Sequence, residues 1–344
     1  MRNRLIYALL GVVLLATGAG CKDPYTPDIT TRNLNYPVVE GEIINGQAET
    51  IFKLSRTAMM ADTSYIKDEL NADIRVEGDD NSSRQLAGIG GGRYTAGILN
   101  LNTAAKYRVH IRTSDGKEYA SAFVNVHTNP PIDSVTWRWE PAEGVKVFVH
   151  THDPANNTRY YRWQYEETWE HDVYYISAMK YVTPPPRVIE RPANETLPIR
   201  CWQYENSSSI IIHSTARLQN DIVKDKQLLT VPNGSWKMGV KYTVLVKQFT
   251  MDKQAFDYWQ MMKRNTESLG SIFDPQPSES RGNITCLTNP SEPVIGWVSA
   301  GSVQEQRIWI SRSQLIGWRY SLICEETQVP AIADSRRFIS AVAC

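Results

Sequence analysis

The sequence lacks a long hydrophobic run and an excess of charge of either sign. Its N-terminal apolar stretch, residues 5–16, is too short to cross a bilayer as a helix. The 344 residues contain 37 Lys and Arg against 37 Asp and Glu. A nucleic-acid-binding protein normally has a basic excess, so nucleic acid is not expected as a partner.

Recognisable catalytic motifs are also missing. The sequence has no G-x-S-x-G elbow, H-E-x-x-H pair, Walker loop or Rossmann glycine pattern. The glycine-rich residues 88–92 lie outside any parallel-sheet pattern and predict a hairpin turn. We therefore expect no catalytic residue, no cofactor and no metal, and predict that the protein is not an enzyme.

Cysteine is scarce, with five residues. Apart from Cys21 there is an even number, which suits disulfides in an oxidising compartment: Cys201, Cys286, Cys324 and Cys344. Four cysteines allow three pairings, and we favour Cys201–Cys286 with Cys324–Cys344. A zinc site is the alternative, but no C-x-x-C spacing supports it.

The N-terminus has the features of a bacterial lipoprotein signal peptide. Arg2 and Arg4 precede the apolar stretch, and small residues then lead to Cys21. Removal of residues 1–20 would leave Cys21 free for lipid attachment, which anchors a protein to a membrane without a spanning helix. Gly18 occupies the place of the usual lipobox leucine, so a conventionally cleaved secreted protein is the alternative.

Residues 36–129 show the alternation of β-strands. Between residues 107 and 112, apolar side chains alternate with basic ones, and the Ser-Asp-Gly-Lys sequence at 114–117 predicts a hairpin turn. A polar tether, residues 21–35, precedes this region. Short strands separated by turn residues predict an antiparallel β-sandwich.

The Asn-Pro-Pro sequence at 129–131 predicts a domain boundary, and residues 130–344 form the second predicted domain. Its expected strands include 134–139, 145–150, 160–169 and 241–249. A helix is predicted from the N-cap Asp252, with an apolar stripe that includes Tyr258 and an end at Gly270. The fold class is therefore mainly β: two antiparallel immunoglobulin- or fibronectin-like sandwiches, the second with long loops and at least one helix.

Tryptophan and tyrosine are abundant, with 10 and 17 residues against 7 Phe. Trp137 and Trp139 share one face of a predicted strand and could stack on sugar rings or line a protein interface, or else pack in the core. Trp163 and Trp169 flank a cluster of carboxylates. If the protein captures a ligand, these four tryptophans are the predicted contacts.

Two polar clusters have a catalytic and a structural explanation. Glu166 and Glu170 share one side of a strand and could act as the carboxylate pair of a glycosidase, or form a salt-bridged strand rim. His150 and His152 share a strand face and could bind a metal together with Asp153, or could be a polar pair at a strand end.

Several blocks occur together in order along the chain. They are LSRT at 54–57, EETWE at 166–170, AFDYW at 255–259, GSIFDPQPS at 270–278, GNITC at 282–286 and PVIGWVSA at 293–300. The sequence thereby resembles the DUF4249 family of Bacteroidota lipoproteins. Lys22-Asp23 is similar to a surface-export signal of such lipoproteins, or is the start of a solvated tether.

The resemblance implies a cell-envelope lipoprotein, often encoded beside a TonB-dependent outer-membrane transporter, and it supplies no catalytic residues. We expect a lipid-anchored outer-membrane protein at the cell surface that acts as a non-catalytic accessory or interaction module with such a transporter. The alternative is surface capture of a glycan or peptide for import. A glycan hydrolase is a further alternative.

Overall fold

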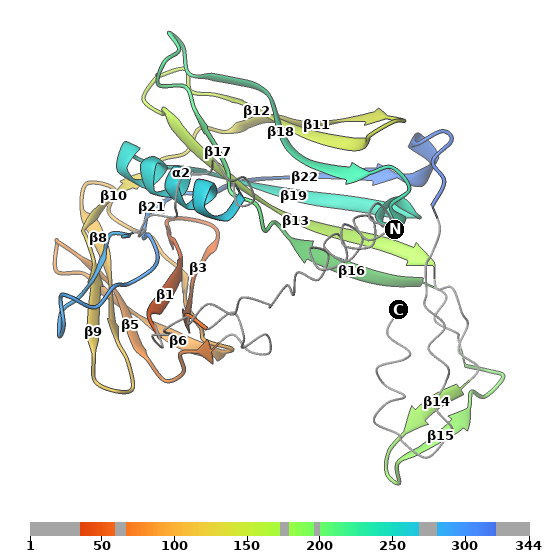
Figure 1. Cartoon of the computed structure of the whole chain (residues 1–344), viewed down its shortest axis with the longest axis horizontal. Helices are drawn as coiled ribbons and strands as arrows, with labels where there is room; N and C mark the ends of the chain where they lie inside the picture. Colours follow the sequence, from red (N-terminus) through yellow and green to blue (C-terminus); the bar gives the residue numbers. More distant parts are fainter. Residues whose placement is uncertain (1–34, 59–66, 173–178, 196–199, 268–280, 321–344) are drawn as a thin grey trace, which may run out of the picture.

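The computed structural model describes residues 35–58, 67–172, 179–195, 200–267 and 281–320. These residues form mainly antiparallel β-structure in two sandwich domains, as the sequence predicts (Figure 1). The predicted signal peptide, Cys21 and nearly all of the tether lie outside the described residues. Within the described part of the chain, no helix is long and apolar enough to cross a membrane.

The first domain is a sheet that folds over on itself at β6. The strands follow the order β1 (Pro37–Gly41), β3 (Glu49–Arg56), β7 (Arg93–Ile98), β6 (Ser83–Gly90), β5 (Asp73–Gly78), β8 (Lys106–Arg112), β10 (Val124–His127), β21 (Ala300–Gly301) and β2 (Ile43–Ile44). Three short strands pair beside this path: β4 (Lys67–Asp68), β9 (Glu118–Ser121) and β20 (Ile284–Cys286). One end of β6 pairs with β5 and the other with β7, so the two layers share this strand.

Alternation along each strand explains the first core. In β8, Tyr107, Val109 and Ile111 are buried while the residues between them are half-buried or exposed. Phe52 and Leu54 from β3 approach the same cluster from the other layer. One apolar face per strand is thus enough to define this sandwich.

The second domain packs a three-stranded sheet on a larger one. The small sheet has the order β11 (Ile132–Glu140), β12 (Gly144–His152) and β18 (Ile222–Pro232). The larger sheet has the order β16 (Arg200–Asn206), β13 (Tyr160–Asp172), β19 (Lys241–Thr250) and β22 (Gln304–Ser311), with β17 (Ile211–Ser214) also on β13. Beside them lie the hairpin of β14 (Met179–Val182) and β15 (Arg187–Glu190) and the single-turn helices η1 (Trp236–Met238) and η2 (Arg312–Gln314).

The two sheets of the second domain meet in one apolar cluster. β12 contributes Val145, Val147 and Val149, and β13 contributes Tyr161 and Trp163. All five side chains are completely buried. Burial of valines on one sheet against aromatic rings on the other closes the sandwich.

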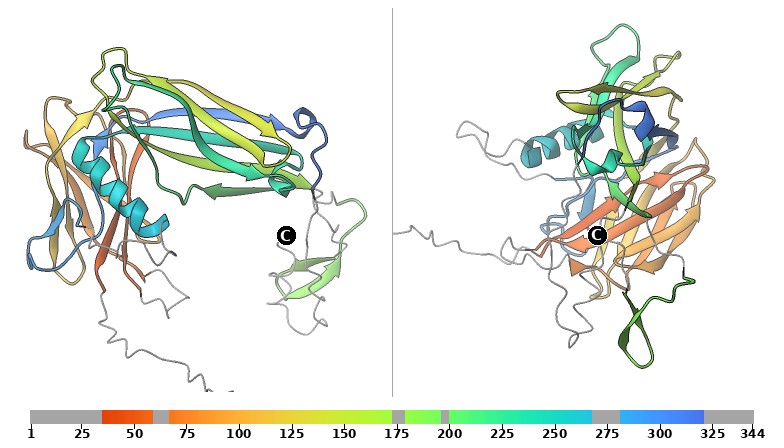
Figure 2. Two further views of the ribbon diagram at one scale, coloured as in Figure 1. Left: turned by 45° about the horizontal axis from the view of Figure 1, so that its top comes forward. Right: turned by 90° about the vertical axis from the view of Figure 1, so that its right-hand side faces the viewer.

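The helix α2 (Lys253–Glu267) begins where the sequence predicts. The Asp252 carboxylate accepts a hydrogen bond from the Ala255 amide at 2.8 Å, which caps the helix N-terminus. Ala255 and Tyr258 of the apolar stripe are buried. The predicted end at Gly270 lies outside the described residues. Figure 2 shows α2 lying at the junction of the two domains.

The structure corrects the assignment of the whole of residues 130–344 to the second domain. Five buried residues from the last part of the chain belong to the first core: Ile284, Cys286, Val294, Val298 and Ala300. β20 pairs with β9, and β21 pairs with β10 and β2. The chain therefore leaves the first domain after β10, builds most of the second, returns to the first and then enters the second again as β22.

The chain passes from the first domain to the second twice, and these two crossing segments run side by side. β10 and β21 are parallel, with Val126 opposite Ala300, and both continue into the second domain. Asn129, on the first crossing, is buried, and its side-chain amide donates hydrogen bonds to the carbonyl oxygens of Gln248 (2.9 Å) and Ser302. Its carboxamide oxygen accepts from the Thr250 amide at 3.2 Å. One side chain thus joins both crossings to β19.

Candidate functional site

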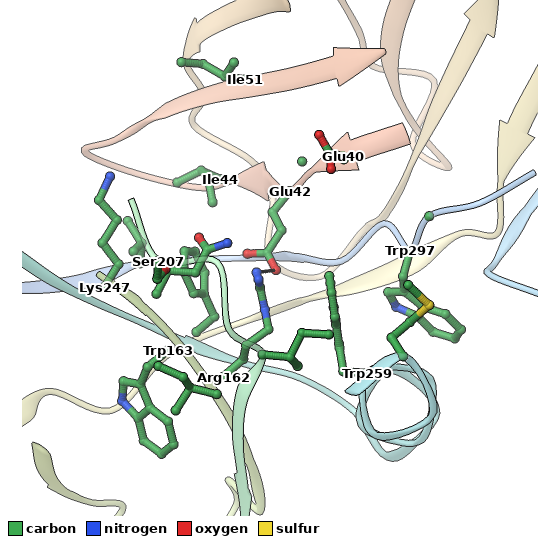
Figure 3. A pocket seen from close by; sticks show the side chains of 18 of the residues that line it. Glu40, Glu42, Ile44, Ile51, Arg162, Trp163, Ser207, Lys247, Trp259 and Trp297 are labelled. Atoms are coloured by element: carbon green, nitrogen blue, oxygen red, sulfur yellow. Dashed lines mark hydrogen bonds and ion pairs between the residues drawn. The ribbon is translucent and has the colours of Figure 1, made fainter. Parts of the chain in front are cut away.

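A cleft of about 600 Å³ lies between the two domains, beside α2 (Figure 3). Residues 38–51 of the first domain form one wall, and outward-facing residues of β13 and β19 form the other. Residues 207–211 and 295–297 complete the lining together with one side of α2. Both domains therefore contribute to one concave surface.

An ion pair between Arg162 of β13 and Glu42 bridges this cleft. The Arg162 guanidinium also lies over two rings, 4.8 Å from the centroid of Phe249 and 4.7 Å from that of Trp259. The paired side chains are only 7% and 15% exposed, so salt and water screen them weakly. Because its two partners come from different domains, the pair holds the walls of the cleft together.

Aromatic rings form the wall nearest to α2. Tyr258 packs against Trp259 and Trp297, with centroids 5.5 and 5.4 Å away. Gly296, with φ of +140°, allows this segment to approach β1, since a Cβ there would lie 2.2 Å from the Val39 carbonyl oxygen. Burial raises the pKa of Tyr258 to about 12, so its hydroxyl stays protonated at neutral pH.

The cleft continues onto the outer face of the β16-β13-β19-β22 sheet, the face turned away from the second core. Because side chains alternate along β13, Trp163 points into the core while Arg162 and Glu166 point outward. Lys247 of β19 lines the cleft and pairs with Glu166 at 2.6 Å and with Glu305 at 3.7 Å. The outer face and the cleft are one continuous surface.

The four tryptophans predicted as ligand contacts do not form an exposed surface. Trp163 is completely buried and Trp169 is 4% exposed, both within the second core. Trp137 and Trp139 are half-buried and pack against the same core. The structure thus corrects the predicted binding set and favours the core alternative.

The exposed aromatics of the sheet are residues that the sequence interpretation missed. They are Trp202 (53% exposed), Tyr204 (81%) and Trp309 (49%). Only Trp309 could have been identified from the sequence pattern. Ile308 and Ile310 lie on the core side of β22, so alternation places Trp309 on the outer side.

Glu166 and Glu170, the candidate hydrolase pair, have separate ion-pair partners. Glu166 pairs with Lys247, and Glu170 lies 3.7 Å from Arg200. Positions four apart on a strand are about 13 Å from each other, whereas glycosidase carboxyl groups are about 5–10 Å apart. The salt-bridged rim is therefore the better explanation for these residues.

Glu167, on the inner side of β13, has a structural environment. It is 6% exposed, accepts a hydrogen bond from the Tyr242 hydroxyl at 2.7 Å and pairs with Lys237 at 3.1 Å. Burial alone would lower the pKa of Lys237, but Glu205 and Glu167 outweigh it and raise that pKa. The lysine stays charged and compensates the buried carboxylate.

The two candidate metal-binding histidines make different contacts. The His150 ring nitrogen Nε2 lies 2.9 Å from the Thr136 hydroxyl, and His152 lies 2.8 Å from Asp133. The hydrogen bond to Asp133 raises the pKa of His152. Among the described residues, no three His, Cys, Asp or Glu side chains are grouped as metal ligands.

The favoured disulfide between Cys201 and Cys286 is wrong, because both thiols are free. Cys201 is on β16 of the second domain, whereas Cys286 is on β20 in the first core. The positions of the two cysteines in the sequence did not show that they would belong to different domains. Cys324 and Cys344 lie outside the described residues.

Comparisons with known proteins extend these observations only modestly. No curated protein matches the sequence. A two-domain fibronectin type-III segment of chicken tenascin matches at 11% identity and a TM-score of 0.18, covering 63% of this chain and 93% of that one. A DUF4785 family protein from Legionella pneumophila matches at 11% identity and a TM-score of 0.21, covering 62% and 50%. Such low TM-scores support no inference.

The match to a family model is more extensive. The model described as "Domain of unknown function (DUF4249)" covers residues 22–307, which include all the strands of both domains up to the middle of β22. The predicted resemblance is thereby confirmed at the level of the family. The chain belongs to the DUF4249 family.

Proposed function

We propose that this chain is a lipid-anchored outer-membrane protein at the cell surface that acts as a non-catalytic accessory or interaction module. Its partner is a TonB-dependent transporter, and the partner contacts the cleft between the two domains. The observation that supports this proposal is the cleft itself, a concave surface built from both domains and held by the Arg162–Glu42 pair.

The rigidity of the scaffold supports a binding role for this cleft. Two parallel crossings and the hydrogen bonds of Asn129 connect the domains. A surface that is ordered before binding loses less conformational entropy when a partner docks. The exposed segment at Ser208 and the half-buried rings of Trp259 and Trp297 supply polar and aromatic contacts at the rim.

The ionisable groups near the cleft suit binding better than acid–base chemistry. Glu42 pairs with Arg162, and Lys247 pairs with Glu166 and Glu305. A general acid or base needs a pKa near the working pH and a free path to its substrate. The paired side chains instead neutralise one another, as expected in a structural or docking surface, while Glu40 and Glu49 of the lining are exposed to solvent.

Removal of the lipid-accepting thiol should detach the protein from the membrane. We expect Cys21→Ser to shift essentially all of the protein from the membrane fraction to the soluble fraction and to abolish labelling with palmitate. Cys201→Ser removes a thiol that is far along the sequence and should leave the distribution unchanged. Retention of the Cys21→Ser variant in the outer membrane would contradict lipid anchoring through this residue.

The partner can be identified by crosslinking from the cleft. A photo-reactive residue at Ser208, an exposed position of the cleft lining, should crosslink to a TonB-dependent transporter in intact outer membranes. The same residue at Lys224, an exposed position on β18 in the opposite sheet, is the matched control and should give little crosslinking. Purification in mild detergent followed by mass spectrometry identifies the product.

Two results would contradict the accessory role. Recovery of the protein alone, without a stoichiometric outer-membrane partner, would remove the support for a transporter complex. Equal crosslinking from positions 208 and 224 would show that the cleft is not the docking surface.

A further inference from the structure

Three large aromatic side chains are exposed on the outer face of the β16-β13-β19-β22 sheet. Trp202 and Tyr204 are two residues apart on β16 and therefore point to the same side, and Trp309 shares this side from β22. We call Trp202, Tyr204 and Trp309 with the intervening Thr168 and Thr243 the outer aromatic face. Its aromatic members are about half or more exposed.

The strand register defines the shape of this face. Tyr204 lies opposite Thr168, Thr168 opposite Thr243, and Thr243 opposite Trp309. With strands about 4.8 Å apart, the two rings at the ends of this row are about 14 Å from each other. Between these rings Thr168 is half-buried and Thr243 is almost completely buried, and Trp202 adds a third exposed ring along β16.

The centre of the row is polar and covered by its neighbours. The Thr243 hydroxyl donates a hydrogen bond to the Ile308 carbonyl oxygen at 2.8 Å and is nearly fully buried. Lys241 lies over the Trp309 ring, 4.5 Å from its centroid, and holds that ring in place. This contact orders the Trp309 ring, whereas the Tyr204 ring projects into solvent.

Charges on this face cancel. The strand alternation places four acidic residues on it, Glu166, Glu170, Asp172 and Glu305, and five basic ones, Arg162, Arg200, Lys241, Lys247 and Arg307. Arg162 is neutralised by Glu42 of the first domain, which leaves four charges of each sign. Most of them pair with one another, as Lys247 does with Glu166 and Arg200 does with Asp172 at 2.9 Å. A neutral surface gives no long-range attraction to phosphates or polyanions. Its charged groups still offer strong hydrogen bonds to hydroxyls.

The combination of exposed flat rings and balanced charge indicates the chemistry of the ligand. Sugar rings present C–H faces that pack on aromatic side chains and hydroxyls that exchange hydrogen bonds with charged groups. A protein partner would instead favour a surface whose centre is depleted of charge. Here charged residues lie directly beside the aromatic row on both sides, Glu170 and Lys241 on one and Glu166 and Arg307 on the other.

We propose that the outer aromatic face binds an uncharged glycan chain, which lies across the strands from Tyr204 to Trp309. The chain can continue toward the cleft, because Lys247 belongs to both the outer face and the cleft lining. This activity goes beyond the accessory role proposed above and does not require a transporter.

The test uses the full lipoprotein in detergent and a panel of soluble polysaccharides. The neutral members are a β-glucan, a xylan, a mannan and an α-glucan, and polygalacturonate is the charged member. We expect at least one neutral polysaccharide to retard the protein in affinity electrophoresis. Trp309→Ala and Tyr204→Ala should each weaken that binding about tenfold, since each removes one stacking ring.

The matched control is Phe123→Ala in the first domain. Phe123 is 41% exposed, and the Arg108 guanidinium lies over its ring, 4.8 Å from the centroid. Lys241 lies over the Trp309 ring in a similar way. This change should leave polysaccharide binding unaltered. Thermal unfolding of each variant shows whether the fold is retained, which we expect for all three exposed positions.

Several outcomes would overturn the proposal. They are binding to no neutral polysaccharide, binding to polygalacturonate alone, and binding that Trp309→Ala and Tyr204→Ala leave intact. A dimer that Trp309→Ala dissociates would assign the face to a second copy of the chain and would also overturn it. Crosslinking from Ser208 in the Trp309→Ala variant reports separately on the transporter, so failure of one proposal does not imply failure of the other.

Discussion

Replacing Trp163 with alanine should lower the free energy of unfolding by about 3–5 kcal/mol, as expected for removal of a completely buried indole. The ring stacks on Tyr161 with centroids 5.5 Å apart. Its Nε1 donates a hydrogen bond to the Gln248 side-chain oxygen at 2.9 Å. The substitution therefore leaves both a cavity and an unpaired buried acceptor. Urea-induced unfolding monitored by circular dichroism measures the change.

The matched change is Trp309→Ala, which removes the same side chain from a half-exposed position. It should change the free energy of unfolding by at most about 0.5 kcal/mol. If Trp163→Ala kept its stability and lost ligand binding instead, the binding set expected from the sequence would be restored. The contrast thus separates core tryptophans from surface tryptophans by measurement.

Replacing Arg162 with alanine should destabilise the protein by about 3 kcal/mol. The change leaves Glu42 largely buried without its cation and removes the contacts to Phe249 and Trp259. The closest control is Arg138→Ala, because Arg138 also pairs with a carboxylate, Asp225, and also lies over a ring. That pair is 55% and 36% exposed.

Arg138→Ala should therefore cost no more than about 1 kcal/mol. Both variants can be compared by the urea concentration at the unfolding midpoint, with the denaturant slope held the same. Similar losses for the two arginines would show that burial between the domains adds nothing to the Arg162–Glu42 pair. Glu42→Gln in the Arg162→Ala background should recover part of the stability, because the unpaired charge is then removed.

Local patterns in the sequence were sufficient for the general fold. The alternation at residues 107–112 correctly gave β8, and the Ser-Asp-Gly-Lys turn joins β8 to β9 through the hydrogen bond from the Thr113 amide to the Lys117 carbonyl. The N-cap Asp252 correctly placed the start of α2. These features depend on residues close together in sequence, where backbone geometry and side-chain chemistry act directly.

The candidate site could not be predicted in the same way, because β16 reverses the usual pattern. On this strand Cys201, Gln203 and Glu205 share the side of the buried Glu167, and Glu205 pairs with Lys237 of η1 at 2.5 Å. Trp202 and Tyr204 are consequently left on the exposed side. The register of β16 against β13 decides which side faces outward, and no local pattern contains this long-range pairing.

The return of the chain to the first domain governs the order in which a newly made protein can fold. The Val39 amide donates to the Ile295 carbonyl oxygen, a contact between residues that are 256 positions apart (295 minus 39). Synthesis from the N-terminus delivers the first strands long before their last partners, and such distant contacts form slowly. Residues 284–301 complete one core and β22 the other sheet. Both sandwiches therefore receive a late strand or core segment from the same short stretch of chain.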